Sequence, residues 1–413
     1  MKLIKDEGLP LIDEMKDRFS ELKIHAEVAK FQHTHIWQAD GRTPRVGVVV
    51  KTYVDGSHYE GQIVEGKRHG KGIYTYANRD RYYGDWKDDV FDGTGIYMFG
   101  DGNTYVGQLR DGKKHGFGNH LYADGSRYEG QWAFDRKNGK GLFRNAQTLC
   151  EYDGEWKDNE RHGFGRFKYP NGDSFEGHWD QGKKSGRGIF VFANKTRFNG
   201  NWEDNKANGE GTLTFENGDK YIGFFKDNKK NGYGTYSYSK MQTVYEGNWK
   251  DDMRHDKGIF IFENGDRYEG SWKQDLRDGF GTYEYKSGLK YYGHWAKDLR
   301  DGFGEMSLPD GQLYKGNWKR GAKNDFGTYF FSCGDSYEGN WLNGKKHGNG
   351  RYEWANKDVY KGPYRHDRMH GWGEYTDANG VVYDVKFNED VLVQFDRKGF
   401  GGPRDSLPQV TAN

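Results

Sequence analysis

The chain repeats a short pattern along most of its length, and this repeat restricts the fold more than any other feature. An aromatic residue followed two positions later by Gly recurs every 23 residues, or 24 in the units that begin at Tyr128 and Tyr221. The leading rings are Tyr59, Tyr82, Tyr105, Tyr128, Tyr152, Phe175, Phe198, Tyr221, Tyr245, Tyr268, Tyr291, Tyr314, Tyr337 and Tyr360. A fixed period of this length indicates an array whose units pack mainly against their neighbours.

Each unit has the pattern of a β-hairpin. Gly stands two and thirteen residues after the leading ring in all fourteen units, and Trp stands four residues after it in ten. Residues at i, i+2 and i+4 share one face of a strand. We expect the following polar stretch, such as Gly66–Gly70, to turn the chain. A second aromatic alternation then ends at an Asn-Gly or Asp-Gly turn, which predicts a hairpin for each unit.

The composition favours a thin structure whose buried residues are rings. Only 33% of the 413 residues are hydrophobic, 17% are aromatic, and 62 are Gly. A glycine inside a strand has no side chain to pack, so we expect rings from neighbouring strands to lie across the bare backbone. Because one layer has no second layer above it, we also expect the rings to stay partly uncovered.

The unit resembles the repeat of the MORN (membrane occupation and recognition nexus) family. The resemblance rests on Tyr-Glu-Gly-Asn-Trp at Tyr245–Trp249 and Tyr337–Trp341, and on Gly-Lys-Lys-His-Gly-Asn-Gly at Gly344–Gly350. It covers residues 46 to about 387. It implies an all-β repeat protein, built as an elongated, twisted, single-layer antiparallel sheet of consecutive hairpins. Asp256 and Asp325 depart from the pattern, because they replace the Gly eleven residues after the ring.

The repeats leave little chain at either end. We predict an N-terminal helical cap or docking segment at 1–45, a half repeat at 46–58, fourteen repeats at 59–382, and a terminal half repeat and tail at 383–413. Two strands are expected at 384–387 and 391–395. The apolar stripe of the short N-terminal helix is Leu11, Met15, Phe19 and Leu22. This helix either caps the first hairpin or docks a partner.

Four stretches match the spacing of a phosphate-binding loop without its context. They are Gly61–Lys67, Gly107–Lys113, Gly177–Lys183 and Gly339–Lys345. Such a loop leads into a helix and carries Ser or Thr after the Lys, whereas here the first Gly falls in a predicted strand. The recurring His residues before a Gly and the Glu residues after the leading ring form ladders of equivalents, not a catalytic set. We predict a protein that is not an enzyme, with no cofactor and no metal site.

Charge and cysteine content bear on partners and compartment. The net charge is +1, which gives no global reason to expect nucleic acid. No apolar run approaches the length of a membrane span, and the N-terminus lacks the apolar region of a signal peptide. Cys150 and Cys333 are far apart and fit reduced thiols. These features predict a cytoplasmic protein.

Two sets of residues are candidates for binding. The first is the aromatic face, predicted to hold protein partners: Trp132, Trp156, Trp179, Trp202, Trp249, Trp272, Trp295, Trp318 and Trp341. The second is a basic rim formed by the turns inside the units, predicted to meet an anionic surface: Lys67, Arg68, Lys113, Lys114, Lys183, Lys184, Lys229, Lys230, Lys345 and Lys346. Turns between units are often acidic, as at Asp266, so we expect opposite charges on the two edges of the sheet.

These features favour a structural scaffold that binds other proteins through its aromatic-lined sheet. All-MORN chains resemble radial spoke-head components of cilia and other cytoskeletal scaffolds. The resemblance therefore implies axonemal or cytoskeletal partners and a place in the ciliary or flagellar axoneme. A homodimer through a terminal repeat is also considered. The alternative is a peripheral membrane adaptor whose basic rim binds acidic phospholipids, and such binding would weaken steeply with salt.

Overall fold

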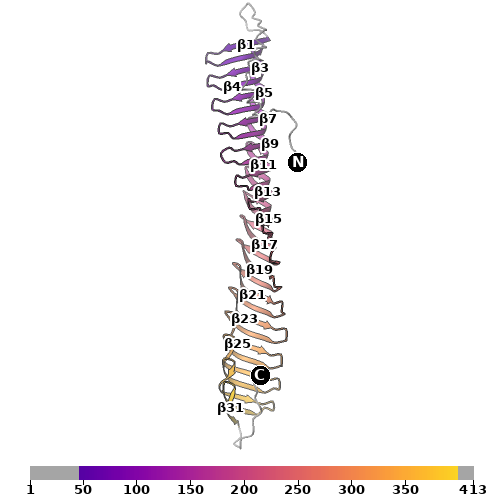
Figure 1. Ribbon diagram of the computed structural model, residues 1–413, viewed down its shortest axis with the longest axis vertical. Coiled ribbons are helices and arrows are strands. Elements are labelled where there is room, and N and C mark those ends of the chain that lie inside the picture. The colour runs from indigo at the N-terminus through magenta and orange to yellow at the C-terminus, as the bar shows by residue number, and fades with distance from the viewer. Residues whose placement is uncertain (1–45, 399–413) are drawn as a thin grey trace, which may run out of the picture. The chain divides into compact units, whose positions relative to one another are not determined.

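The computed structural model of the chain describes residues 46–398, shown in colour in Figure 1. The predicted N-terminal helix lies outside these residues. The chain divides into two compact units, Met1–Lys206 and Ala207–Asn413. Within residues 46–398 every regular element is a strand, and no helix is present. The prediction of an all-β repeat protein made of consecutive antiparallel hairpins is confirmed for this part of the chain.

The first unit holds fourteen complete strands. They are β1 Val46–Thr52, β2 His58–Val64, β3 Lys67–Thr75, β4 Arg81–Lys87, β5 Val90–Met98, β6 Thr104–Arg110, β7 Lys113–Leu121, β8 Arg127–Ala133, β9 Arg136–Arg144, β10 Glu151–Lys157, β11 Glu160–Lys168, β12 Ser174–Asp180, β13 Lys183–Val191 and β14 Arg197–Glu203.

The second unit holds the remaining strands, of which β15 begins at the boundary residue. They are β15 Lys206–Thr214, β16 Lys220–Lys226, β17 Lys229–Tyr238, β18 Thr243–Lys250, β19 Met253–Ile261, β20 Arg267–Lys273, β21 Leu276–Glu284, β22 Lys290–Ala296, β23 Leu299–Ser307, β24 Leu313–Lys319, β25 Ala322–Phe330, β26 Ser336–Leu342, β27 Lys345–Glu353, β28 Val359–Arg365, β29 Arg368–Met369, β30 Gly371–Thr376, β31 Val382–Asn388 and β32 Val391–Arg397.

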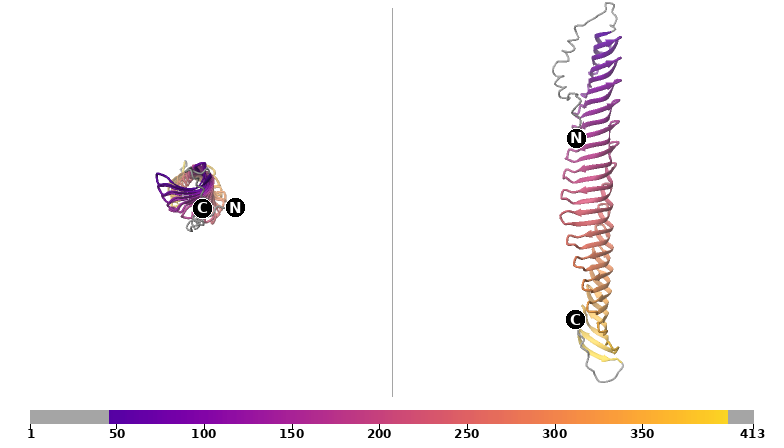
Figure 2. Two further views of the ribbon diagram at one scale, coloured as in Figure 1. Left: turned by 90° about the horizontal axis from the view of Figure 1, so that it is seen from above. Right: turned by 90° about the vertical axis from the view of Figure 1, so that its right-hand side faces the viewer.

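Within each of the two compact units, strands that follow one another in the chain pair side by side, and the same register recurs from repeat to repeat. In the second unit β18 pairs with β19 so that Gly247 faces Gly258, and β19 pairs with β20 so that Gly258 faces Gly270. Glycines thus form a row across the sheet. No second layer of described elements covers either face of these sheets (Figure 2). Burial must therefore come from side chains that lie flat on the sheet.

The turn inside each repeat is shorter than predicted. Gly66–Gly70 was expected to turn the chain, but β3 already begins at Lys67, so the turn consists of Glu65 and Gly66. In the equivalent turn Asp251 and Asp252 both have positive φ, 50° and 69°. Two successive residues in this region form the tight hairpin turn that Asn, Asp and Gly favour. The turn residues are therefore often acidic, and the predicted basic turns are instead the first residues of the next strand.

A bulge follows the turn in each repeat. The register shifts between Gly247 and Trp249 of β18, and the facing strand carries Asp256 with a φ of 56°. Other repeats place Gly here, for example Gly279 with a φ of 100°. Asp325, the second departure noted in the sequence, has a φ of 59°. Both aspartates keep the left-handed conformation that Asp tolerates better than most residues, so the bulge is preserved there.

The ends of the described chain add partial repeats. The half repeat predicted before Tyr59 supplies β1, which pairs with β2. The two strands predicted after residue 383 are present as β31 and β32, paired with each other. The strand pairing is interrupted once near this end. Pro363 in β28 has no N–H group, and His370 between β29 and β30 donates its N–H to the Pro363 carbonyl oxygen at 2.9 Å.

Candidate interaction surfaces

The leading rings form the core of each sheet. Tyr245 is fully buried, and its ring lies flat against Gly247 of its own strand and Gly258 of the next. A methyl group at Gly258 would overlap the ring. The Tyr245 hydroxyl donates a hydrogen bond to the Asn248 carbonyl oxygen at 2.9 Å, which satisfies its one donor. The inference that rings lie across bare glycine backbone is confirmed. We call this side of the sheet the ring face.

Each Trp on the ring face fills the space between two leading rings. Trp272 packs edge-on against Tyr245 and Tyr268, with ring centroids 5.5 and 5.1 Å apart. Its Nε1–H donates to the Gly258 carbonyl oxygen at 3.2 Å. Edge-to-face contact is the arrangement that aromatic quadrupoles favour. The row therefore locks each repeat to the one before it.

The expectation that a single layer leaves these rings partly uncovered is wrong for the Trp row. The nine predicted partner-binding tryptophans expose 3–7% of their surface: Trp132, Trp156, Trp179, Trp202, Trp249, Trp272, Trp295, Trp318 and Trp341. Neighbouring rings and cations cover them from the sides and from above. Their role as partner anchors stays a prediction, and any such contact would use the small part of each ring that remains exposed.

A cation covers most of the tryptophans, a role not predicted for these residues from the sequence. The Arg277 guanidinium carbon lies 4.3 Å from the Trp295 ring centroid. Its Nε donates to Asp298 Oδ1 at 2.9 Å, and its second terminal nitrogen donates to the Asp298 carbonyl oxygen at 3.0 Å. Cation–π contact and a charge-assisted hydrogen bond thus act together. The equivalent cations are Arg68, Lys114, Lys137, Arg161, Lys184, Lys230, Arg254, Arg300, Lys323 and Lys346.

The structure therefore divides the predicted basic rim into two groups. Arg68, Lys114, Lys184, Lys230 and Lys346 lie on the ring face among the aromatic side chains. Lys67, Lys113, Lys183, Lys229 and Lys345 are exposed beside the turns.

Electrostatics distinguishes the two groups of cations. Burial among the rings lowers the pKa of Lys184 to about 8, because desolvation disfavours the charged form. Lys183 instead forms an ion pair with Asp204 at 2.8 Å, and Lys229 forms one with Asp251 at 3.6 Å. The exposed lysines thus stand beside acidic turn residues, so the rim is mixed in charge.

The turns between repeats are also tied together. Asp266 Oδ1 accepts a hydrogen bond from the Lys286 N–H at 2.9 Å, and its Oδ2 accepts one from the Tyr283 hydroxyl at 2.9 Å. Burial alone would raise the pKa of Asp266, but these hydrogen bonds outweigh it and lower the pKa below its usual value. At the edge formed by the turns between repeats, at least this carboxylate therefore stabilises the fold by joining neighbouring turns.

The face opposite the ring face carries exposed aromatic residues in the second unit. Phe280, Phe303 and Phe326 occupy the same position in three consecutive repeats and are 37%, 54% and 53% exposed. Tyr292 packs edge-on against Phe280 with centroids 4.5 Å apart, and it is exposed as well. We call these four residues the phenylalanine stripe. Consecutive strands lie about 4.8 Å apart, so Phe280, Phe303 and Phe326, which are two strands apart, have rings separated by about 10 Å.

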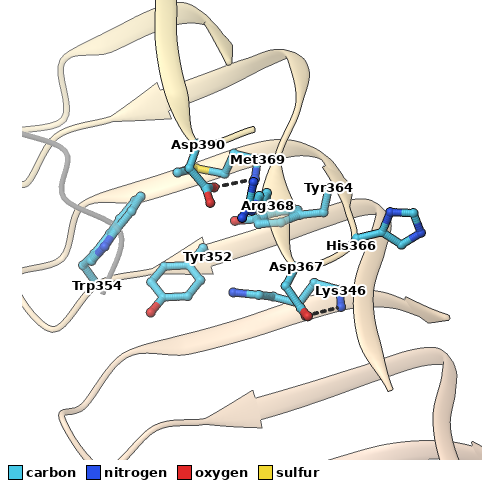
Figure 3. Close-up of a pocket in the computed structure, with 9 residues that line it drawn as sticks. All are labelled: Lys346, Tyr352, Trp354, Tyr364, His366, Asp367, Arg368, Met369 and Asp390. Atoms are coloured by element: carbon cyan, nitrogen blue, oxygen red, sulfur yellow. Dashed lines mark hydrogen bonds between the residues drawn. The ribbon is translucent and has the colours of Figure 1, made fainter. Parts of the chain in front are cut away.

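One pocket stands out on the ring face of the second unit (Figure 3). Its volume is about 420 Å³, and it lies where the last two complete repeats meet. The walls include Tyr352, Trp354, Tyr364, Lys346 and Met369. In Figure 3 the Tyr364 ring extends into the middle of the group, between Lys346 and Met369.

The residues whose spacing resembles a phosphate-binding loop, and the recurring histidines, lie in the hairpins. Gly61 lies in β2 and Lys67 in β3, so the spacing of a phosphate-binding loop falls on a hairpin. His69 was expected in a turn but lies in β3. Its Nδ1 is buried without a hydrogen-bond partner in residues 46–398, as is Nδ1 of the equivalent His115 and His347. His255 Nδ1 lies 3.1 Å from Asp256 Oδ1. In other repeats this position caps a turn, since Asn208 Oδ1 accepts the Asp227 N–H at 3.0 Å.

No group of three or more His, Cys, Asp or Glu side chains between residues 46 and 398 could hold a metal ion. That same stretch contains no helix with the length and apolar character needed to cross a membrane.

Comparison with known families gives one clear result. The MORN repeat family matches the chain at fourteen consecutive segments, which are residues 59–81, 82–104, 105–127, 128–146, 152–174, 175–197, 198–220, 221–240, 245–267, 268–290, 291–313, 314–336, 337–359 and 360–382. No curated protein sequence matches the chain significantly.

Solved structures give only weak similarity. A mutant TCP10 domain of Danio rerio CPAP is 12% identical, with 64% of this chain and 95% of that chain covered, at a TM-score of 0.17. The SAS-4 (dCPAP) TCP domain of Drosophila Melanogaster, in complex with a proline-rich motif of Ana2 (dSTIL), is 11% identical, with coverages of 59% and 99% and a TM-score of 0.22. Virginiamycin B lyase from Staphylococcus aureus is 7% identical, with coverages of 82% and 94% and a TM-score of 0.12. TM-scores this low carry no argument about this chain.

Proposed function

Because the chain belongs to the MORN repeat family, we propose that it is a non-enzymatic scaffold whose repeat sheet binds protein partners. The observation that carries this proposal is the phenylalanine stripe of the second unit. Large aromatic residues are the usual anchors of protein interfaces, and a row of exposed rings on a soluble surface marks an interaction site more often than chance. The ring face, by contrast, is occupied with holding the repeats together.

The spacing of the stripe specifies a partner geometry. Rings about 10 Å apart match the rise of seven residues of an α-helix, which is about 10.5 Å. An α-helix with apolar side chains at seven-residue intervals could therefore lie across the strands and contact Phe280, Phe303 and Phe326 in turn. Amphipathic helices dock in this way on apolar surfaces. We propose such a helix as the partner element.

The proposed setting is the cytoskeleton, with the ciliary or flagellar axoneme and its radial spoke head as the first place to test. This part of the proposal rests on the resemblance to all-MORN scaffolds described above. It includes a cytoplasmic location and a homodimer through a terminal repeat. Light scattering of the purified chain tests the homodimer directly.

The test is affinity purification from ciliated cells, with mass spectrometry of what is captured. A triple variant, Phe280→Asn with Phe303→Asn and Phe326→Asn, places at each position the residue that Asn349 supplies in another repeat. The sheet should therefore stay intact while partners are lost. The matched control is Lys257→Asn. Lys257 occupies the same position in a repeat that has no aromatic residue there, so this variant should retain the partners.

Two outcomes would reject parts of the proposal. Capture of the same proteins by the triple variant and by the wild-type chain would show that the phenylalanine stripe is not the binding surface. A set of captured proteins without cytoskeletal components would reject the axonemal setting and leave the scaffold role standing.

The second candidate is a membrane adaptor that uses the exposed lysines of the rim. These lysines are Lys67, Lys113, Lys183, Lys229 and Lys345, and their side chains are exposed beside the turns. Acidic residues beside them weaken the case, as in the pair of Lys183 with Asp204. Sedimentation with phosphoinositide vesicles at low and at physiological salt decides the matter, since binding through exposed charges falls steeply with ionic strength.

A further inference from the structure

Four apolar side chains form a line on the face opposite the ring face in the first unit. Each lies directly opposite the next across paired strands, and they are Ile73 in β3, Tyr83 in β4, Ile96 in β5 and Val106 in β6. We call these four residues the apolar row. Asn119 in β7 and Glu129 in β8 continue the line, so the apolar stretch is confined to four consecutive strands.

The apolar row is buried, whereas residues at the same position in the second unit are exposed. Val106 exposes 5% of its surface, and Ile96 exposes 8%. Ile222 and Tyr292 occupy the position of Val106 in two repeats of the second unit, and they are 50% and 53% exposed. A side chain at this position of a one-layer sheet therefore stays half exposed unless another part of the chain lies over it.

The cover over the apolar row comes from outside the described strands. Every regular element within residues 46–398 is a strand of the sheet, and none of these strands lies over this face. The compact unit that contains the apolar row begins at Met1, whereas residues 399–413 belong to the other unit. The part of the chain left to supply the cover is therefore residues 1–45, which lead directly into β1.

The N-terminal sequence supplies the side chains that such a cover requires. Its apolar stripe at helical spacing is Leu11, Met15, Phe19 and Leu22. A helix rises about 16 Å over this stretch, and the apolar row crosses three strand spacings, which is about 14 Å. The two apolar surfaces therefore match in length.

The connection between the stripe and the sheet is long enough for this contact. The chain from Leu22 to Val46 can extend over about 80 Å. The distance from β1 to β6 across the sheet is five strand spacings, or about 24 Å. The stripe can therefore reach every residue of the apolar row within one chain.

We propose that the apolar row is the docking surface for the chain's own N-terminal segment, which packs its stripe of Leu11, Met15, Phe19 and Leu22 against it. The segment is then a cap on one face of β3–β6 and not a docking element for a partner. This contact closes the face in the first unit, whereas the second unit keeps the phenylalanine stripe exposed on the same face. The inference does not rest on the proposed function, because it concerns contacts inside the first unit.

Thiol labelling of the full-length chain tests whether the apolar row is covered. Cys150 and Cys333 are first replaced by Ser. A single cysteine is then introduced as Val106→Cys or, as the matched control, as Ile222→Cys. A buried thiol reacts only when its cover opens. With native exposures of 5% and 50%, a maleimide should modify Val106→Cys at least about tenfold more slowly than Ile222→Cys.

Two substitutions in the N-terminal segment identify the cover. Met15→Asp places a carboxylate in the apolar stripe, and burial of an unpaired charge against apolar side chains is costly. It should therefore raise the labelling rate of Val106→Cys to within about threefold of the rate of Ile222→Cys. Lys16→Asp adds a carboxylate at the next residue, outside the stripe, and should leave the labelling rate of Val106→Cys unchanged.

The dependence on chain concentration separates docking within one chain from docking of a second copy. Slow labelling of Val106→Cys that is independent of chain concentration supports the proposal, whereas labelling that slows as the concentration rises assigns the cover to a second copy and rejects it. Equal labelling rates for Val106→Cys and Ile222→Cys would overturn the cover itself. Slow labelling that Met15→Asp leaves unchanged would overturn the N-terminal stripe as the cover.

The fold of each variant is checked by its thermal unfolding midpoint. Ile96 lies opposite Val106 and is 8% exposed, so Ile96→Cys is the second reporter if Val106→Cys lowers the midpoint, and the same order of labelling rates is expected from it. None of these variants changes the phenylalanine stripe. Failure of the stripe to bind partners therefore has no bearing on the labelling result.

Discussion

The glycine row makes a sharp prediction about what a single methyl group would do. Gly270 in β20 faces Gly281 in β21. A Cβ atom at Gly270 would lie 2.5 Å from the Gly281 Cα, 2.5 Å from the Tyr268 hydroxyl oxygen and 2.8 Å from the Phe280 carbonyl oxygen. Two of these atoms belong to the backbone of the facing strand, so no rotamer change can make room. Gly270→Ala should separate the two strands and lift the Tyr268 ring.

The cost can be built from the contacts that would be lost. Overpacking of a core costs about 1–3 kcal/mol. Tyr268 also packs edge-on against Trp272 and Trp295, at centroid distances of 5.1 and 5.5 Å, and each such pair contributes about 0.5–1.5 kcal/mol. Its hydrogen bond to the Ser271 carbonyl oxygen, 3.0 Å long, adds about 1 kcal/mol. Together these give a local destabilisation of about 3–7 kcal/mol.

A matched control separates the effect of steric overlap at the added methyl group from the effect of backbone strain. Gly321 has a φ of 87°, and a methyl group added there would have no atom within 4 Å. Gly321→Ala therefore costs only the left-handed backbone penalty, about 1–2 kcal/mol. Both variants add the same single methyl group within the second unit.

Hydrogen exchange followed by mass spectrometry is the suitable assay, because units of a repeat array open locally. Each 1.4 kcal/mol changes the exchange rate about tenfold. Peptides from β20 and β21 should exchange about 10² to 10⁵ times faster in Gly270→Ala, against about tenfold near the turn in Gly321→Ala. Equal acceleration in the two variants would refute the claim that the ring and the facing strand leave no room at Gly270.

Further predictions concern the rings, the bulge and the buried cations. Trp272→Ala should destabilise its repeat by about 3–5 kcal/mol, since the indole is buried, and wild-type resistance to protease would contradict the packing role. Asp256→Gly should stabilise β19 by about 1 kcal/mol, because Gly adopts its φ of 56° without strain; a lower denaturation midpoint would count against this. Lys184 has a pKa of about 8 in the fold against an ordinary value of 10.5, so the unfolded chain binds more protons between these values and stability should rise with pH from about 8 towards 10. Lys184→Met, which copies Met369, should flatten that rise by roughly 1 kcal/mol in denaturant titrations at pH 7.5 and 9.5, and an unchanged slope would show that the lysine stays hydrated.

The hairpins followed from the sequence because their causes are local. A ring and a Gly two residues apart, such as Tyr245 and Gly247, share a face and leave room for the ring to lie down. The tight turn was predicted at Gly66–Gly70, several residues beyond its true position, because Gly66 and the polar residues after it are typical of turns. Only the backbone conformation shows that the turn ends at Gly66 and that Lys67 already pairs in the strand.

The displaced turn also hid the buried cations. Alternate residues of a strand share one face, so Lys184, four residues before Gly188, is placed on the ring face if both lie in one strand. The prediction put Lys184 in a turn, where this alternation does not apply. The recurrence of Lys or Arg at this one position was the available signal. The cover over the tryptophans was missed for a related reason, because the side chains that form it, such as Arg277 over Trp295, come from the preceding repeat.

The pocket could not have been predicted from the sequence in the same way. Tyr364 and Met369 are visible as departures from the pattern, but each is a conservative change taken alone. Their effect depends on how they meet Lys346, Trp354 and Asp390 on one face of the sheet. The volume left between such side chains is a property of their assembled packing.

The bonds that reach from one repeat into the next have a consequence for how such a gene can change. Trp272 binds a carbonyl in the repeat before it, and Arg254 binds Asp275 in the repeat after it. Excision of 23 consecutive residues from a run of 23-residue repeats would therefore bring together a donor and an acceptor of the same kinds as those removed. Loss of 22 or 24 residues from within the strands would put each ring on the wrong side of the backbone. Unequal recombination that adds or removes whole repeats can thus lengthen or shorten the array and keep the strand register across the new junction.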